Sequence, residues 1–208
     1  MLVVTALSCV KGERVLFSGI HFHVQAGEML HVQGPNGSGK TSLLRMLCGL
    51  SAPEQGEILW QNRSLRTERD AFFASVAYLG HQNAIKDELS AVENLRVASA
   101  IAGQHVSDAQ ACRGLAAMGL AGKEDLQVKV LSQGQRRRVA LTRLLLSKSP
   151  LWLLDEPLAA LDVTGVALVE KMLDAHLTQG GMAVVTTHQP LKVSAVTQSV
   201  YLGVSGHA

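Results

Sequence analysis

The segment Gly34-Pro-Asn-Gly-Ser-Gly-Lys-Thr41 constrains the fold of this chain more than any other feature. It matches the pattern G-x-x-x-x-G-K-[ST], follows an apolar run at 29–32 and precedes leucines at helical spacing. A strand, a glycine-rich loop and a helix in this order form a phosphate-binding unit of α/β proteins. The motif therefore predicts an α/β fold with an anion site at this loop.

The chemistry of the loop is that of a nucleoside triphosphate site. Glycines allow positive φ angles and close approach of backbone N–H groups to phosphate, and the following helix adds partial positive charge at its start. Lys40 is expected to reach the β and γ phosphates and the Thr41 hydroxyl to bind Mg²⁺. The candidate nucleotide-binding residues are Gly34, Pro35, Asn36, Gly37, Ser38, Gly39, Lys40, Thr41 and Ser42.

A second candidate site lies where the apolar run 151–154 ends in Asp155 and Glu156. Open α/β sheets bind their ligands at the carboxyl ends of the strands, so both carboxylates are expected beside the phosphate loop. Asp155 is expected to hold Mg²⁺, directly or through a water, and Glu156 to accept the proton of an attacking water. The pair predicts hydrolysis of the bound nucleotide, whereas a strand that merely ends in solvated acids is the alternative.

Hydrophobic periodicity predicts alternating strands and helices, and therefore a largely parallel sheet. Two helices without an intervening strand suggest a helical insertion in the middle of the chain, and Gly49 is expected to end the first helix. The predicted strands are 15–24, 29–32, 58–60, 76–79, 152–154 and 183–186, and the predicted helices start near 41 and span 91–102, 108–118, a stretch from 133 and the region of 166–177.

Composition excludes several classes of protein. The 208 residues carry a net charge of only +2, which is too small for binding nucleic acid through bulk charge. No window approaches the ~18 consecutive apolar residues of a membrane span. Residues 1–9 faintly resemble a lipoprotein cleavage site but lack a basic region. Three cysteines without paired spacing predict reduced thiols and a cytoplasmic location.

Six motifs in order resemble those of ABC-type ATPases, and the resemblance covers essentially the whole chain. They are the phosphate loop, Gln82 after a strand, Leu131-Ser-Gln-Gly-Gln135, the Asp155-Glu156 strand, Ala160-Leu-Asp162 and Thr187-His188. The resemblance implies a P-loop NTPase fold with a mostly parallel core sheet, an antiparallel β subdomain and an inserted helical subdomain. It implies a single domain over 1–208, with the core at about 1–82 and 140–208 and the helical subdomain at about 83–139.

The resemblance also assigns roles to single residues. Ser132 is a good N-cap for a helix beginning at Gln133. Together with Gly134 it would bind the γ-phosphate that is held by the phosphate loop of a second copy of the chain. ATP would thus be buried between two copies in a homodimer. Gln135 and Asp162 are the other residues expected to contact the nucleotide. Gln82 would approach Mg²⁺ and the attacking water, and His188 would bond to the γ-phosphate and steady Glu156.

Within the ABC ATPases, the chain is more similar to the CcmA family of cytochrome c maturation than to importers. This likeness rests on Gly80-His-Gln82, Ile58-Leu-Trp60, Arg137-Arg-Val-Ala-Leu141 and Thr186-Thr-His-Gln-Pro-Leu191. It implies a peripheral subunit on the cytoplasmic face of the bacterial inner membrane, with integral subunits of the CcmB and CcmC type. ATP hydrolysis would energise haem export or release of a haem-loaded chaperone.

The chain departs from the ABC pattern at two places. Gln133 replaces the small residue that many transporters carry, and the segment around Val10 and Lys11 lacks the usual aromatic ring for adenine, so that Lys11 or Phe17 is left to replace it. Arg136 and Arg137 are interpreted as a solvated helix face rather than a nucleic-acid patch. The alternative functions are a soluble ABC ATPase acting on nucleic acid or ribosomes and a regulator without hydrolysis.

Overall fold

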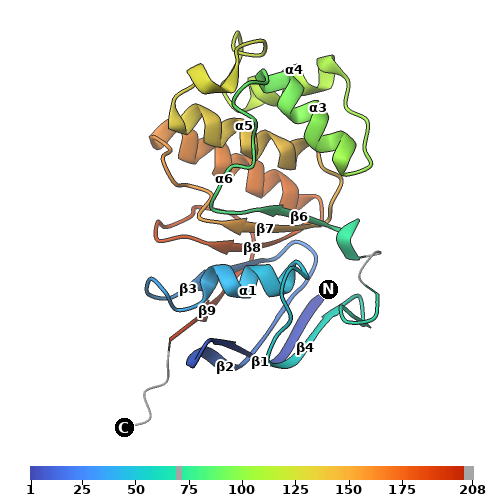
Figure 1. Cartoon of the computed structure of the whole chain (residues 1–208), viewed down its shortest axis with the longest axis vertical. Helices are drawn as coiled ribbons and strands as arrows, with labels where there is room; N and C mark the ends of the chain where they lie inside the picture. Colours follow the sequence, from blue (N-terminus) through green and yellow to red (C-terminus); the bar gives the residue numbers. More distant parts are fainter. Residues whose placement is uncertain (69–71, 204–208) are drawn as a thin grey trace.

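Five parallel strands form the sheet that carries the phosphate loop in the computed structural model, which describes residues 1–68 and 72–203 (Figure 1). Each strand pairs in parallel with its neighbour, so their carboxyl ends lie at one edge. In spatial order the strands are β6 (Val76–Leu79), β7 (Leu151–Asp155), β8 (Met182–Thr186), β3 (Met29–Gln33) and β9 (Thr197–Tyr201).

A second, antiparallel sheet lies on the far side of helix α1 (Lys40–Leu47) from the parallel sheet (Figure 1). Its strands, in spatial order, are β2 (Arg14–Val24), β1 (Leu2–Lys11), β4 (Gln55–Trp60) and β5 (Arg63–Ser64). Buried residues of this sheet, of α1 and of one face of the parallel sheet form one hydrophobic cluster. Helix α1 is therefore enclosed by both sheets, and this packing fixes the loop from which it starts.

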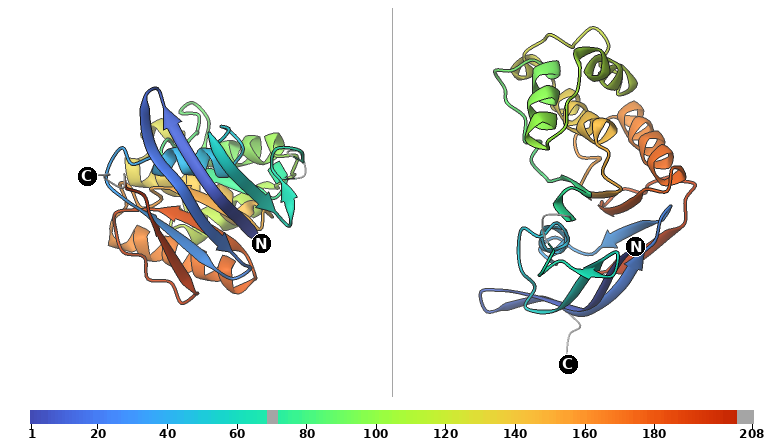
Figure 2. Two further views of the ribbon diagram at one scale, coloured as in Figure 1. Left: turned by 90° about the horizontal axis from the view of Figure 1, so that it is seen from below. Right: turned by 90° about the vertical axis from the view of Figure 1, so that its right-hand side faces the viewer.

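The helices α3 (Ala91–Ile101), α4 (Asp108–Ala117), α5 (Gln133–Leu146) and α6 (Val163–Thr178) lie on the other side of the parallel sheet (Figures 1 and 2). Helices α5 and α6 contribute to a cluster with that face of the sheet. Helices α3 and α4 pack with α5 and the 3-10 helix η1 (Val128–Val130) around a third cluster. No helix within 1–68 and 72–203 has the length and apolar character needed to cross a membrane.

The predicted mixture of a parallel sheet, an antiparallel sheet and helices is confirmed. Helix α1 ends at Leu47, and Gly49 follows with a φ of +70°. This agrees with the prediction that Gly49 marks the end of the first helix. Three strands, β1, β5 and β9, were not predicted from the hydrophobic periodicity. Leu2, Val4 and Leu7 of β1 are buried in the core, so residues 2–11 form a structural strand in this fold.

Candidate active site

The phosphate loop joins β3 to α1 and depends on its glycines. Gly39, the N-cap of α1, has a φ of +99°, and a Cβ there would lie 2.9 Å from Cδ1 of Phe17. Gly34 has a φ of +146°, and a Cβ there would collide with the carbonyl oxygen of Leu202. The backbone is thus held between two packed walls in a conformation that L side chains rarely adopt.

Lys40, the first residue of α1, is buried although it carries a charge. Its side chain is 9% exposed, and Nζ donates to the carbonyl oxygens of Gly34 at 2.8 Å and Pro35 at 3.2 Å. The Ser38 hydroxyl is buried beside it and has no hydrogen-bond partner within 1–68 and 72–203. A buried ammonium group and an unpaired hydroxyl in one loop are suited to oxygen atoms of an anionic ligand.

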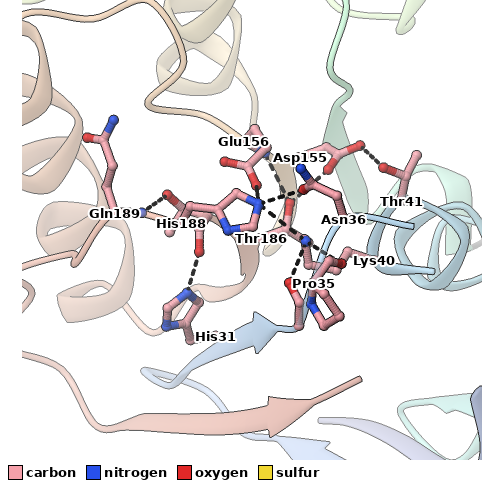
Figure 3. A network of polar contacts seen from close by, with 12 residues as sticks. His31, Pro35, Asn36, Lys40, Thr41, Asp155, Glu156, Thr186, His188 and Gln189 are labelled. Carbon is pink, nitrogen blue, oxygen red and sulfur yellow. Dashed lines mark hydrogen bonds and ion pairs between the residues drawn. The ribbon is translucent and has the colours of Figure 1, made fainter. Parts of the chain in front are cut away.

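Asp155 closes the site from the tip of β7, where it is 2% exposed (Figure 3). Its Oδ2 accepts from the Thr41 hydroxyl at 2.8 Å, and its Oδ1 accepts from the Thr186 hydroxyl at 2.8 Å. Burial, followed by the Asp155 charge, raises the pKa of nearby Tyr78 to about 12. The hydroxyl and carboxylate oxygens of Thr41 and Asp155 are the hard ligands that Mg²⁺ prefers, so this pair fits a magnesium ion.

Glu156 follows in a strained backbone conformation. Its φ is +48°, a left-handed value that costs a non-glycine residue about 1–2 kcal/mol. The backbone N–H donates to the carbonyl oxygen of Thr186 at 3.0 Å and to the Thr186 hydroxyl at 3.1 Å. Its Oε1 is buried without a hydrogen-bond partner among the described residues, so this carboxylate retains an unused acceptor for the proton of a water.

His188 connects Glu156 to the phosphate loop (Figure 3). Its Nε2 lies 3.5 Å from Oε1 of Glu156, 3.1 Å from Oδ1 of Asn36 and 3.4 Å from Nζ of Lys40. The Asn36 oxygen, at the shortest of these distances, favours the tautomer with a proton on Nε2. The preceding carbonyl of Thr187 lies 3.0 Å from Nε2 of His31, which fixes the backbone that carries His188.

Lys40, Asp155, Glu156 and His188 line one open cavity of about 560 Å³, together with five more residues of the predicted loop set: Asn36, Gly37, Gly39, Thr41 and Ser42. His81 also lines this cavity, whereas the predicted ligand Gln82 is exposed and is not among the lining residues. At the rim lie Lys11, Arg14 and Leu16, and no Phe, Tyr or Trp side chain of the described residues lines the cavity. Phe17 is 2% exposed and packs under Gly39, so it is not placed to stack on a nucleobase.

The helix start at Ser132 lies elsewhere, because neither Ser132 nor Gly134 lines this cavity. Ser132 is the N-cap of α5, as predicted, since its Oγ accepts from the Gln135 N–H at 3.3 Å and Gln135 Oε1 accepts from the Ser132 N–H at 3.0 Å. A Cβ at Gly134 would lie 2.7 Å from the Ala160 carbonyl oxygen. Nearby, Asp162 caps α6 by accepting from the Gly165 N–H at 2.7 Å.

The interpretation of Arg136 and Arg137 as a solvated helix face is wrong. Arg137 is 3% exposed, and its guanidinium group donates to backbone oxygens at the end of β7 and in the loop after β6. Arg136 is partly buried and donates to the carbonyl oxygens of Leu131 at 3.0 Å and Lys129 at 2.6 Å. The position of Arg137 on the helix directs its side chain toward the sheet. Because residues 136–138 are all arginine, the sequence does not distinguish this buried position from its neighbours.

The structure adds four residues to the predicted set: Thr186, His81, His31 and Arg137. Thr186 ends a buried strand, and its position two residues before the predicted His188 was the available signal. His81 directly precedes Gln82. His31 lies inside β3, and only its distance to Thr187, 156 positions further along the chain, reveals its contribution.

Comparison with known proteins gives a consistent result. Residues 17–159 match the family model of the ABC transporter. A "Cytochrome c biogenesis ATP-binding export protein CcmA" from Dechloromonas aromatica is 53% identical over 95% of this chain and 97% of its own length. A putative ABC transporter ATP-binding protein from Pyrococcus furiosus has a similar structure, with a TM-score of 0.83, 23% identity and coverage of 95% of this chain and 96% of its own. A dimeric ATP-binding cassette in a post-hydrolysis state, bound to ADP and Pi, has a TM-score of 0.76 and 24% identity, covering 91% of this chain and 88% of its own.

Proposed function

We propose, on the premise that this chain belongs to the ABC transporter family and to its CcmA group, that it is the ATP-hydrolysing subunit of a membrane complex for cytochrome c maturation. The observation that carries the hydrolytic part is that Lys40, Asp155, Glu156 and His188 line one cavity with the phosphate loop. The proposed role in cytochrome c maturation rests on relatives whose sequences are about half identical to this chain over nearly its whole length. Hydrolysis would energise haem export or release of a haem-loaded chaperone.

In the bound state, the loop 34–42 would surround the triphosphate with N–H groups. Lys40 would exchange its carbonyl partners for the β and γ phosphates, and the Ser38 hydroxyl would gain an acceptor. Thr41 and Asp155 would hold Mg²⁺, which neutralises phosphate charge when bound. Gln82 is proposed as a further ligand, which requires its loop to move toward the cavity.

Hydrolysis would use Glu156 as the general base. Its unpaired Oε1 would accept a proton from the water that attacks the γ-phosphate. His188, with its proton on Nε2, would donate to a γ-phosphate oxygen and would keep the carboxylate in place. Thr186 would hold the Glu156 backbone through the two bonds to its N–H group.

The second half of the site would come from another copy. Ser132, Gly134 and Gln135 at the start of α5 would contact the γ-phosphate held by the partner's loop, and Asp162 would lie near the same interface. A helix start provides free N–H groups and partial positive charge, which suit a phosphate. Loss of the γ-phosphate would weaken the contact between the copies, and that change is the proposed mechanical output.

The proposed partners are ATP, a second copy of the chain and integral membrane subunits of the CcmB and CcmC type. The proposed location is the cytoplasmic face of the bacterial inner membrane. We retain the division into a core of about 1–82 and 140–208 and a helical subdomain of about 83–139 as a proposal, with the helical part as a unit that moves against the core.

The test is to isolate the chain from detergent-solubilised membranes and to identify its companions and its activity. We expect integral subunits of a cytochrome c maturation system and Mg²⁺-dependent release of phosphate from ATP by the isolated complex. Co-isolation of ribosomes or DNA without membrane subunits would overturn the proposed role and favour a soluble ATPase. Tight ATP binding without phosphate release by the complex would reject the hydrolytic part.

A further inference from the structure

Arg137 is the most completely bonded charged side chain described next to the site. A guanidinium group has five N–H donors, and five bonds to acceptors are formed here. Nε donates to the Pro157 carbonyl at 3.2 Å, Nη2 to the carbonyls of Asp155 at 2.9 Å and Glu156 at 2.8 Å, and Nη1 to the Gly80 carbonyl at 3.1 Å and to Asn83 Oδ1 at 2.9 Å.

The acceptors belong to two segments that are far apart in the sequence. One segment, 155–157, carries the proposed base Glu156, and the other, 80–83, carries Gln82. Arg137 itself lies on α5, five residues after the N-cap Ser132. Three segments with proposed roles at the nucleotide therefore meet at a single planar group.

The environment makes these bonds obligatory for the side chain. Arg137 is 3% exposed, and burial lowers its pKa, an effect that the charges of Asp155 and Glu156 only oppose. The fork of donors is rigid, so its acceptors must keep a fixed geometry. The backbone at Glu156 needs these hydrogen bonds, because its φ of +48° persists only if neighbouring bonds maintain it.

We propose that Arg137 is a positioning residue, which fixes the Glu156 turn and the loop 80–83 relative to the helix that starts at Ser132. Thr186 holds the N–H side of Glu156 and Arg137 holds its carbonyl side, so together they set the direction of the carboxylate. This role deepens the proposed function and rests on it. A shift of α5 on contact with a second copy would be transmitted to both segments.

The adjacent residue Arg138 provides a matched control. It lies on the same helix, and its Nη1 donates to the carbonyls of Met118 at 3.1 Å and Gly119 at 3.2 Å, away from the cavity. We expect Arg137→Gln in the assembled complex to lower kcat at least tenfold with the Kd for ATP within threefold of wild type. Arg138→Gln should keep kcat within twofold. Arg137→Lys keeps the charge but not the fork, so it should resemble Arg137→Gln.

A double-mutant cycle separates positioning from a general loss of structure. In a Glu156→Gln background, Arg137→Gln should lower the residual hydrolysis less than twofold, because the group that it orients is already absent. A further tenfold loss in that background would contradict a role through Glu156. Wild-type kcat in both Arg137 variants would overturn the proposal.

Amide hydrogen exchange without nucleotide keeps this test independent of the proposed function. Arg137→Gln should speed exchange of the amides in both 80–83 and 155–156, and Arg138→Gln in neither. Unchanged exchange at both segments in the Arg137→Gln chain would refute the positioning role even if ATP hydrolysis is confirmed. If the wild-type complex does not hydrolyse ATP, the exchange result still decides whether Arg137 fixes the two segments. Should Arg137→Gln fail to fold, Arg137→Lys carries the same comparison.

Discussion

Helices α1 and α5 both start with the features of an anion site, but their surroundings differ. The start of α1 is enclosed by both sheets and faces a cavity with the buried Lys40, Asp155 and the imidazole of His188. At the start of α5, Ser132 and Gln133 are exposed, and the cap is closed by the chain's own Gln135. The start of α1 has charged groups that can bind a ligand and carry out chemistry, whereas the start of α5 is an exposed helix end.

The difference indicates that the sequence motif for a helix start does not by itself specify a site. At α5, the backbone N–H groups of Gln133 and Gly134 have no acceptor among the described residues. A terminus of this kind suits a γ-phosphate presented by a second chain, since the other chain then supplies the metal and the base. The following predictions test this division of labour.

The largest effect is expected at the acid of the α1 site. Glu156→Gln should retain ATP binding but lower hydrolysis by two or more orders of magnitude, because general acid–base catalysis contributes about 10²–10⁴-fold. Phosphate release and binding of a fluorescent ATP analogue provide the two measurements. Turnover near the wild-type value would reject Glu156 as the base and would leave the α1 site as a binding site only.

Lys40→Ala should act on affinity at the same terminus. Hydrogen bonds to charged groups contribute about 1.5–3 kcal/mol, so the Kd for ATP should rise about 10- to 150-fold. Isothermal titration measures the change, and Lys171→Ala, in helix α6 and outside the lining of the cavity, provides the control. Equal affinity in the Lys40 variant would contradict the assignment of the phosphate loop.

Mixing two defective chains tests whether α5 serves a second copy. Ser132→Arg and Lys40→Ala should each be inactive alone, whereas a heterodimer of both retains one composite site with both intact halves. An equimolar mixture should therefore recover up to about a quarter of wild-type phosphate release per chain. A fully active Ser132→Arg homodimer would show that the α1 site works without the α5 terminus.

The smallest effect is expected at the nucleobase end of the α1 cavity. Arg14 lies opposite Lys11 in the β1–β2 pair, and both line the rim. A guanidinium group stacks on aromatic planes with about 0.5–1 kcal/mol at exposed sites, so Arg14→Ala should raise the Kd for ATP about two- to fivefold. Arg63→Ala in β5 is the control, and an unchanged Kd for Arg14→Ala would exclude this contact.

The sequence allowed prediction of the parts whose signal is local. The phosphate loop, the Asp155-Glu156 strand end and the Ser132 cap each depend on neighbours within a few residues, and each appears where it was expected. Strand β1 was missed because its pairing shifts register at several points and Ala6 has a φ of +49°, which breaks the alternation. The short strand β9 at the sheet edge is half exposed and has few apolar residues.

Two other features depend on tertiary contacts instead. They are the burial of Arg137 beside the site and the position of Phe17, which prevents it from stacking on a nucleobase. A run of three arginines has the same composition whether its middle member faces water or the sheet, and only packing against β7 decides this. Phe17 is adjacent to the motif in space, yet it lies under Gly39 rather than over the cavity. Neither fact has a signature in the local sequence.

The position of β3 has a consequence for the biosynthesis of this protein. Its two neighbours in the sheet are β8 and β9, and the Leu202 N–H donates to the Gln33 carbonyl at 2.8 Å, immediately before Gly34. The wall against which the loop packs is therefore translated some 170 residues after the loop itself. A ribosome-bound nascent chain that ends before β8 lacks both strands that flank β3, so nucleotide should not protect it from proteolysis until the final strands have emerged.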